Sequence, residues 1–209
     1  MFFTITLFAQ KPNRGEIGIF GGGAYYLGDV NKIPFIKTKP SFGAFFRHSI
    51  DTRFNLTGSF VYAKISGSDA ESKNAYYISR NKSFSHSIYE LSSKLEFNFI
   101  PFIAGDKKTK YTPYTFAGLA FSYTTNAYTN YLFSIPFGIG YKYNLTEDFI
   151  IGAEYSMRKT FTDKLDFPEE PYIPGSKQQN YAANSDWYSI FGIYLAYKIK
   201  YRMKCPAFD

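Results

Sequence analysis

The chain has 209 residues, a length that suits one domain of about eight strands and their connections. No segment approaches the roughly 18 consecutive apolar residues of a membrane-spanning helix, and the mean hydropathy is −0.26, which excludes a helical membrane protein. The net charge of +7 is scattered along the chain without a nucleic-acid recognition motif, so we do not expect nucleic acid as a partner.

The N-terminal sequence MFFTITLFA resembles the end of a secretory signal peptide. Its apolar run ends at Ala9, a small residue after which a signal peptidase can cut. The alternative, that these residues form a short first strand, remains open. We therefore divide the chain into a signal-peptide remnant at 1–9, a β-barrel at 10–201 and a C-terminal tail at 202–209.

Alternation of apolar and polar residues defines the expected strands. A strand sends successive side chains to opposite faces. In the clearest segment, Phe149, Ile151 and Tyr155 share one face, while Glu154 and Arg158 share the other. Eight strands are expected, at residues 15–26, 40–49, 52–65, 85–100, 111–124, 131–145, 148–160 and 185–201.

The connections between these strands sort by length. Short connections are expected at 50–51, 101–110 and 145–147. Long ones are expected at 27–39, 66–84 and 161–184, with 125–130 intermediate. Short turns on one side and long loops on the other are typical of outer-membrane barrels, whose termini lie in the periplasm.

The aromatic content favours a membrane barrel over a soluble β-sandwich. Aromatic residues form 21% of the chain, with 20 Tyr and 23 Phe, more than a soluble core normally carries. A transmembrane barrel places such residues in girdles at the two membrane interfaces and turns its apolar faces to lipid. We therefore predict an all-β, eight-stranded antiparallel transmembrane barrel with long extracellular loops and both termini in the periplasm.

The polar faces of the strands carry charges that a closed barrel would enclose. Charges in a narrow interior need partners, so we expect paired networks rather than isolated ions. The acidic members of this lumen network are Glu16, Glu90, Glu96 and Glu154, and the basic members are Arg53, Lys94, Lys142 and Arg158, with Arg47 as a further candidate. Because side chains fill the interior of an eight-stranded barrel, we do not expect a diffusion pore.

A series of motifs runs along the chain in a fixed order. Residues 16–29 read EIGIFGGGAYYLGD, and the segments 80–99, 112–118 and 136–143 follow. The most specific segment is 158–166, RKTFTDKLD. Together these motifs resemble the PorG-like barrels (also described as DUF6089) of the type IX secretion system, with Thr162, Asp163 and Asp166 at family-motif positions and Lys164 in place of the usual tyrosine.

This resemblance implies an outer-membrane barrel that works with a periplasmic ring, made of a lipoprotein and its partner, and anchors that ring beneath the membrane. Outer-membrane lipid and other outer-membrane secretion components would be further partners. The partner-binding surface is expected on the periplasmic side, at Lys107, Lys108 and Lys110 of one turn and at Arg202, Lys204, Cys205 and Phe208 of the tail.

The tail also has a simpler interpretation. The tail is either a frayed end or a docking segment. Cys205 is the only cysteine, so it is either free or paired with another chain.

Neither catalysis nor a cofactor is expected. His86 lies between Ser85 and Ser87, but no carboxylate at a fixed spacing completes a nucleophilic site, and His48 stands alone. The acidic loop that holds Asp163 matches no EF-hand pattern, so we expect no metal site.

Three rival functions remain open. A stand-alone barrel that takes up apolar molecules would need an apolar lumen. A barrel hydrolase or acyltransferase would need a third catalytic partner beside His86. A soluble lipocalin-like carrier would turn its apolar faces inward around a ligand.

Overall fold

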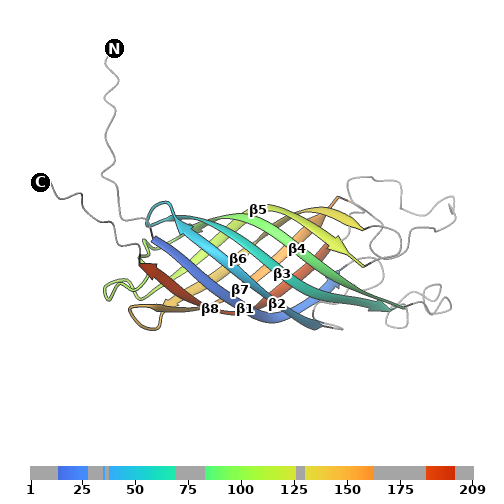
Figure 1. Cartoon of the computed structure of the whole chain (residues 1–209), viewed down its shortest axis with the longest axis horizontal. Coiled ribbons are helices and arrows are strands. Elements are labelled where there is room, and N and C mark those ends of the chain that lie inside the picture. Colours follow the sequence, from blue (N-terminus) through green and yellow to red (C-terminus); the bar gives the residue numbers. More distant parts are fainter. Residues whose placement is uncertain are drawn as a thin grey trace, which may run out of the picture.

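Eight antiparallel strands close into one barrel in sequence order, with β1 pairing with both β2 and β8 (Figure 1). The computed structural model describes residues 14–27, 35, 38–68, 83–125, 130–161 and 187–200. The strands are β1 (Arg14–Leu27), β2 (Lys39–Ser49), β3 (Phe54–Ser68), β4 (Ser83–Asn98), β5 (Tyr111–Thr124), β6 (Tyr131–Asn144), β7 (Phe149–Thr160) and β8 (Trp187–Lys200). The predicted fold class is confirmed, and every strand lies within a few residues of its expected place. In these ranges no helix is long and apolar enough to cross a membrane.

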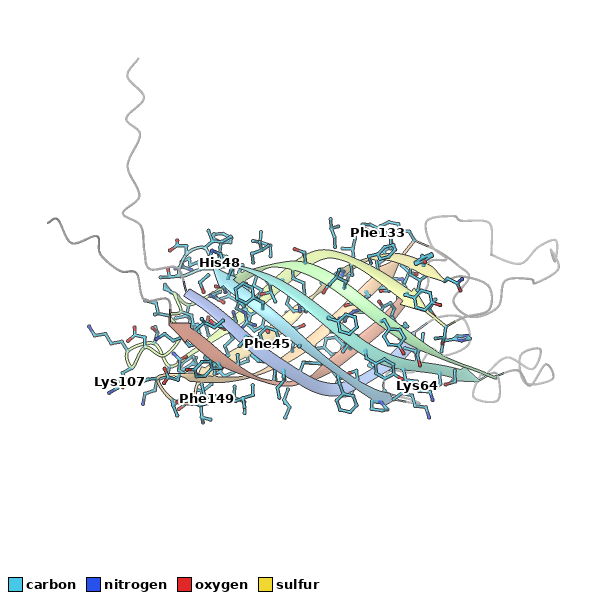
Figure 2. All side chains as sticks on the ribbon, in the orientation of Figure 1. Phe45, His48, Lys64, Lys107, Phe133 and Phe149 are labelled. Carbon is cyan, nitrogen blue, oxygen red and sulfur yellow. The ribbon has the colours of Figure 1, made fainter. Side chains whose placement is uncertain are left out.

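The two ends of the barrel differ. Arg14, which begins β1, pairs with Lys200, which ends β8, so both strands terminate at the same end. The connections 50–53, 99–110 and 145–148 also lie there, and we call it the turn end. The opposite end is the loop end. Figure 2 shows His48, Lys107 and Phe149 at the turn end, and Lys64 and Phe133 toward the loop end.

The outward faces of the strands are apolar. Large apolar side chains are exposed on all eight strands, among them Ile19, Leu91 and Ile139, each more than 60% exposed. Their neighbours in sequence point inward and are buried, as in β5 and β6, where exposed and buried positions alternate. This arrangement excludes the lipocalin-like carrier, because such a carrier would place its apolar faces inside.

Aromatic side chains pair across neighbouring strands near both ends of the wall. At the turn end, Tyr111 stacks on Tyr141 with ring centroids 5.9 Å apart. At the loop end, the rings of Tyr62 and Tyr89 lie 5.2 Å apart. These two aromatic belts, one near each end of the wall, match the girdles that flank the lipid-facing band of membrane barrels.

Side chains fill the interior. Two buried apolar clusters occupy the lumen, and both contact Phe20. Between them lies a cavity of about 20 Å³ lined by Arg47, Lys94 and Arg158, with space for little more than one water molecule. A lumen filled in this way provides no aqueous channel through the described part of the barrel.

Candidate functional site

The lumen contains three groups of paired charges, and Glu96 is the centre of the first. Arg47 binds Glu96 at 2.9 Å and Glu16 at 2.6 Å, and Lys142 binds Glu96 at 2.6 Å. The hydroxyl of Thr57 also donates to Glu96. These residues come from β1, β2, β3, β4 and β6, so Glu96 holds together strands on several sides of the barrel.

The second group is centred on Glu154 of β7. Its carboxylate accepts hydrogen bonds from the Lys94 ammonium at 2.7 Å and from the Tyr114 hydroxyl at 3.1 Å. The ammonium of Lys142 lies 4.4 Å from the centre of the Tyr114 ring, a cation–π contact that joins this group to the first.

The third group binds Glu90 of β4 from across the lumen. The guanidinium of Arg158 donates two hydrogen bonds to its carboxylate, at 2.8 and 3.0 Å. The Tyr188 hydroxyl donates a further one at 2.7 Å. The two-pronged geometry is the one in which guanidinium–carboxylate pairs are strongest.

The structure brings eight of the nine residues considered for the lumen network into ion pairs: Glu16, Arg47, Glu90, Lys94, Glu96, Lys142, Glu154 and Arg158. Arg53 is the exception, and its placement in the lumen was wrong. Its side chain is exposed at the turn end and donates to the carbonyl oxygen of Phe99 at 3.0 Å. Because β3 begins only at Phe54, the inward alternation does not extend to this residue.

These ion pairs link strands on different sides of the barrel across the lumen, and we call them internal braces. Strand β4 supplies Glu90, Lys94 and Glu96, which together bind partners on β2, β6, β7 and β8. Buried charges cost much free energy when unpaired, so full pairing is a condition for enclosing them. Within the described ranges no three acidic, histidine or cysteine side chains gather as metal ligands would. The arrangement is suited to holding the shape of the barrel.

The connection 99–110 folds over the mouth of the barrel at the turn end, and we call these residues the turn-end cap. Phe102 and Ala104 are buried with Tyr194 and other lumen side chains in one apolar cluster. The amide of Phe102 donates to the carbonyl oxygen of Thr52 at 2.9 Å. The expected short turn is therefore an ordered element that closes the turn end.

Asn144, the last residue of β6, fastens the cap to the wall. Its amide nitrogen donates to the carbonyl oxygens of Ile103, Asp106 and Thr109, at 3.0, 3.3 and 2.9 Å. Its oxygen accepts a hydrogen bond from the amide of Gly105 at 3.0 Å. One side chain thus satisfies backbone groups along most of the cap.

Gly105 permits this close approach. Its φ of 72° lies in the left-handed region, which favours glycine. A Cβ atom at this position would overlap the backbone carbonyl of Glu147 in the neighbouring turn. No other residue type fits there without moving the cap.

The three lysines proposed for partner binding all lie on the cap, but their surroundings differ. Lys107 binds Glu147 at 2.9 Å, and the hydrogen bond between them raises the pKa of Lys107. The backbone amide of Lys108 donates to Asp106 and holds the pKa of that carboxyl below its usual range. Lys108 and Lys110 are exposed, and no acidic side chain in the described part of the chain forms an ion pair with either.

The other proposed site residues lie outside the described residues. These are Arg202, Lys204, Cys205 and Phe208 of the tail and Thr162, Asp163 and Asp166 of the family-motif loop. The signal-peptide remnant lies outside as well. Their roles stay predictions.

Replacing Asn144 with alanine is expected to loosen the cap while leaving the strands intact. The change leaves one amide and three carbonyl groups without their present partner, at a cost of about 1–3 kcal/mol for groups that stay buried. Amide hydrogen exchange should therefore rise in residues 102–110 and change little in β4 and β5. Equal protection of the cap in the variant and the wild type would contradict the role of Asn144.

Solved structures of similar fold come from bacterial surface and outer-membrane proteins. Neisserial surface protein A (NspA) is 11% identical and aligns over 88% of this chain and 97% of its own, with a TM-score of 0.52. Ail of Yersinia pestis, in complex with the heparin analogue sucrose octasulfate, is 12% identical over 90% of this chain and 100% of its own, with a TM-score of 0.50. The N-terminal β-barrel domain of Pseudomonas aeruginosa OprF is 16% identical over 91% and 100%, with a TM-score of 0.49.

At these identities the likeness shows the fold alone, which is that of outer-membrane β-barrels. No curated protein matches the sequence. A family model described as a domain of unknown function (DUF6089) matches residues 1–206. The match spans nearly the whole chain, and the protein therefore belongs to the DUF6089 family.

Proposed function

We propose that this protein is a non-enzymatic outer-membrane barrel that anchors a periplasmic ring of the type IX secretion and gliding machinery. The ring would consist of a lipoprotein and its partner, as the resemblance to the PorG-like barrels implies. The apolar outer wall with its two aromatic belts supports insertion in a bilayer.

The observation that carries this proposal is the sealed and braced interior. In the part of the barrel that the structure describes, a lumen filled with paired charges and closed by the turn-end cap offers no path for a solute. It does offer a shape that resists deformation, which an anchor needs. The working surfaces are then the two ends rather than the interior.

The turn end is the expected contact with the ring. In outer-membrane barrels the short turns and both termini lie in the periplasm. The cap with Lys107, Lys108 and Lys110 would share this side with the tail at 202–209. The loop end would face the cell exterior, where it is free to contact other outer-membrane secretion components.

The main alternative, uptake of apolar molecules by a stand-alone barrel, fits the interior less well. Uptake needs an apolar space, whereas the cavity of about 20 Å³ has Arg47, Lys94, Glu154 and Arg158 in its lining beside apolar side chains. Ligand pockets for small molecules are larger, about 300–1,000 Å³.

A detergent pull-down of the tagged chain from its native envelope tests the anchor function. We expect the full chain to recover a periplasmic lipoprotein and its partner, and a variant lacking 202–209 to recover less of both. Heat-modifiable migration of both chains in detergent gels serves as the control for barrel folding. A folded barrel that recovers no periplasmic protein in either form would contradict the anchor function and favour the stand-alone alternative.

A further inference from the structure

We propose that the turn-end cap is a rigid docking element in which Lys108 and Lys110 bind carboxylates on an acidic face of the periplasmic partner, while Lys107 is already paired with Glu147 and Asn144 holds the cap in position. This inference rests on the proposed anchor function and specifies the chemistry of its contact. It also separates the three lysines, which the sequence alone treats as equivalent.

The cap is preorganised. Phe102 and Ala104 are anchored in the lumen, and Asn144 binds the backbone at four points between Ile103 and Thr109. A contact surface that is ordered before binding avoids part of the entropic cost that a flexible loop pays on association. The cap therefore differs from an ordinary mobile turn that happens to carry positive charge.

The position of the cap favours a protein over lipid headgroups. Figure 2 shows Lys107 beyond the ends of the strands at the turn end, away from the outer wall, which carries the aromatic belt. Lipid headgroups would lie beside that belt, around the circumference of the barrel. A partner that approaches along the barrel axis meets the cap first.

The ion pairs of the cap assign different roles to its lysines. Glu147 binds Lys107 and links the cap to the turn between β6 and β7. Asp106 is engaged inside the cap, where it accepts hydrogen bonds from the amide of Lys108 and the hydroxyl of Thr109. The side chains of Lys108 and Lys110 are exposed, and neither forms an ion pair with an acidic side chain among the described residues. They are the groups free to pair with an incoming carboxylate.

Zero-length carbodiimide cross-linking in isolated envelopes tests this inference, because the reagent joins lysine amines to carboxylates that touch them. In the full-length wild type we expect amide cross-links from Lys108 and Lys110 to Asp or Glu residues of the co-purifying periplasmic protein. The double variant K108E/K110E should recover on the order of tenfold less of that protein, since it replaces attraction with repulsion.

Three further variants sharpen the test. Lys64→Glu reverses an exposed charge near the loop end and should leave recovery unchanged. Lys107→Gln, which removes a lysine that is already paired with Glu147, should lower recovery less than K108E/K110E does. Asn144→Ala keeps both contact lysines but should lower recovery, because the cap is no longer fixed to the wall in this variant. All variants are compared only after heat-modifiable migration shows that the barrel is folded.

The outcomes separate this inference from the anchor function. Unchanged recovery by K108E/K110E, or cross-links that avoid Lys108 and Lys110, would overturn the inference and leave the anchor function standing. If the folded wild type recovers no periplasmic protein, both proposals fail.

Discussion

Replacing Glu96 with glutamine is expected to lower the free energy of unfolding of the barrel by about 3–5 kcal/mol, the cost of leaving buried charges without their partner. Glu96 is completely buried and neutralises both Arg47 and Lys142, which are themselves buried. Glutamine has nearly the same shape but no charge, so the two cations would face each other across a neutral amide. Equilibrium unfolding in urea from lipid vesicles measures the loss.

The exposed pair at the turn end provides a matched control. Glu147→Gln also removes a carboxylate from a lysine, but its side chain is 65% exposed and that of Lys107 is 83% exposed. Water screens such a pair, so we expect almost no change in the free energy of unfolding. Equal losses in the two variants would show that the lumen charges are hydrated, and the brace interpretation would then be wrong.

The sequence predicted the strands well because the two faces of the wall differ so strongly in chemistry. In β7, inward Glu154 and Arg158 alternate with outward Phe149 and Ile151, and a shift by one residue would expose charges to the apolar side. The predicted range 148–160 differs from the observed strand by one residue at its start. Alternation of this strength leaves a single register for each strand.

The role of Arg47 was harder to predict. It is 1% exposed and binds two glutamates, yet the sequence marked it only as a further candidate. The adjacent Phe45 and Phe46 obscure the alternation of β2, since one of them packs in the lumen and the other faces outward. The stagger of the strands also decides which charges meet across a lumen. The residue pattern within one strand does not contain information on this stagger.

The turn-end cap was predicted as a short connection that carries three partner-binding lysines, but its packing against the lumen was not predicted. Its sequence does contain a signal, because Phe102 and Ala104 belong to an apolar run at 99–104 that precedes the three lysines. The residue that fastens the cap is distant in sequence: Asn144 lies 39 residues from Gly105, whose amide donates a hydrogen bond to the Asn144 side chain. A contact of this kind requires the closed barrel, so local pattern analysis does not reveal it.

Glycines that face the lumen leave space for the aromatic rings that fill it. Aromatic rings of the lumen lie directly over glycine backbone, as Tyr114 does over Gly140 and Tyr194 over Gly152. Each ring occupies the space that a side chain on the facing strand would need. The sequence analysis expected a crowded lumen, and the structure identifies which rings fill it.

Replacing Gly140 with valine is therefore expected to destabilise the barrel by about 1–3 kcal/mol or more, the usual cost of overpacking a filled core. A Cβ at this position would overlap the ring of Tyr114, which is only 1% exposed. The ring has no free direction to move, because its hydroxyl donates to Glu154 and its face contacts the ammonium of Lys142. Urea unfolding of the variant in lipid vesicles would show the loss as a lower midpoint at unchanged slope.

The matched control lies on the outer wall. Gly58 of β3 is exposed, and a Cβ added there meets no atom within 4 Å. Gly58→Val should therefore keep the stability of the wild type or raise it by up to about 1 kcal/mol, since β-branched residues suit strands better than glycine. Opposite effects of one substitution on the two faces would locate the packed core inside the barrel. If Gly140→Val were tolerated as well as Gly58→Val, the lumen would have unoccupied space, and the argument for a sealed interior would fail with it.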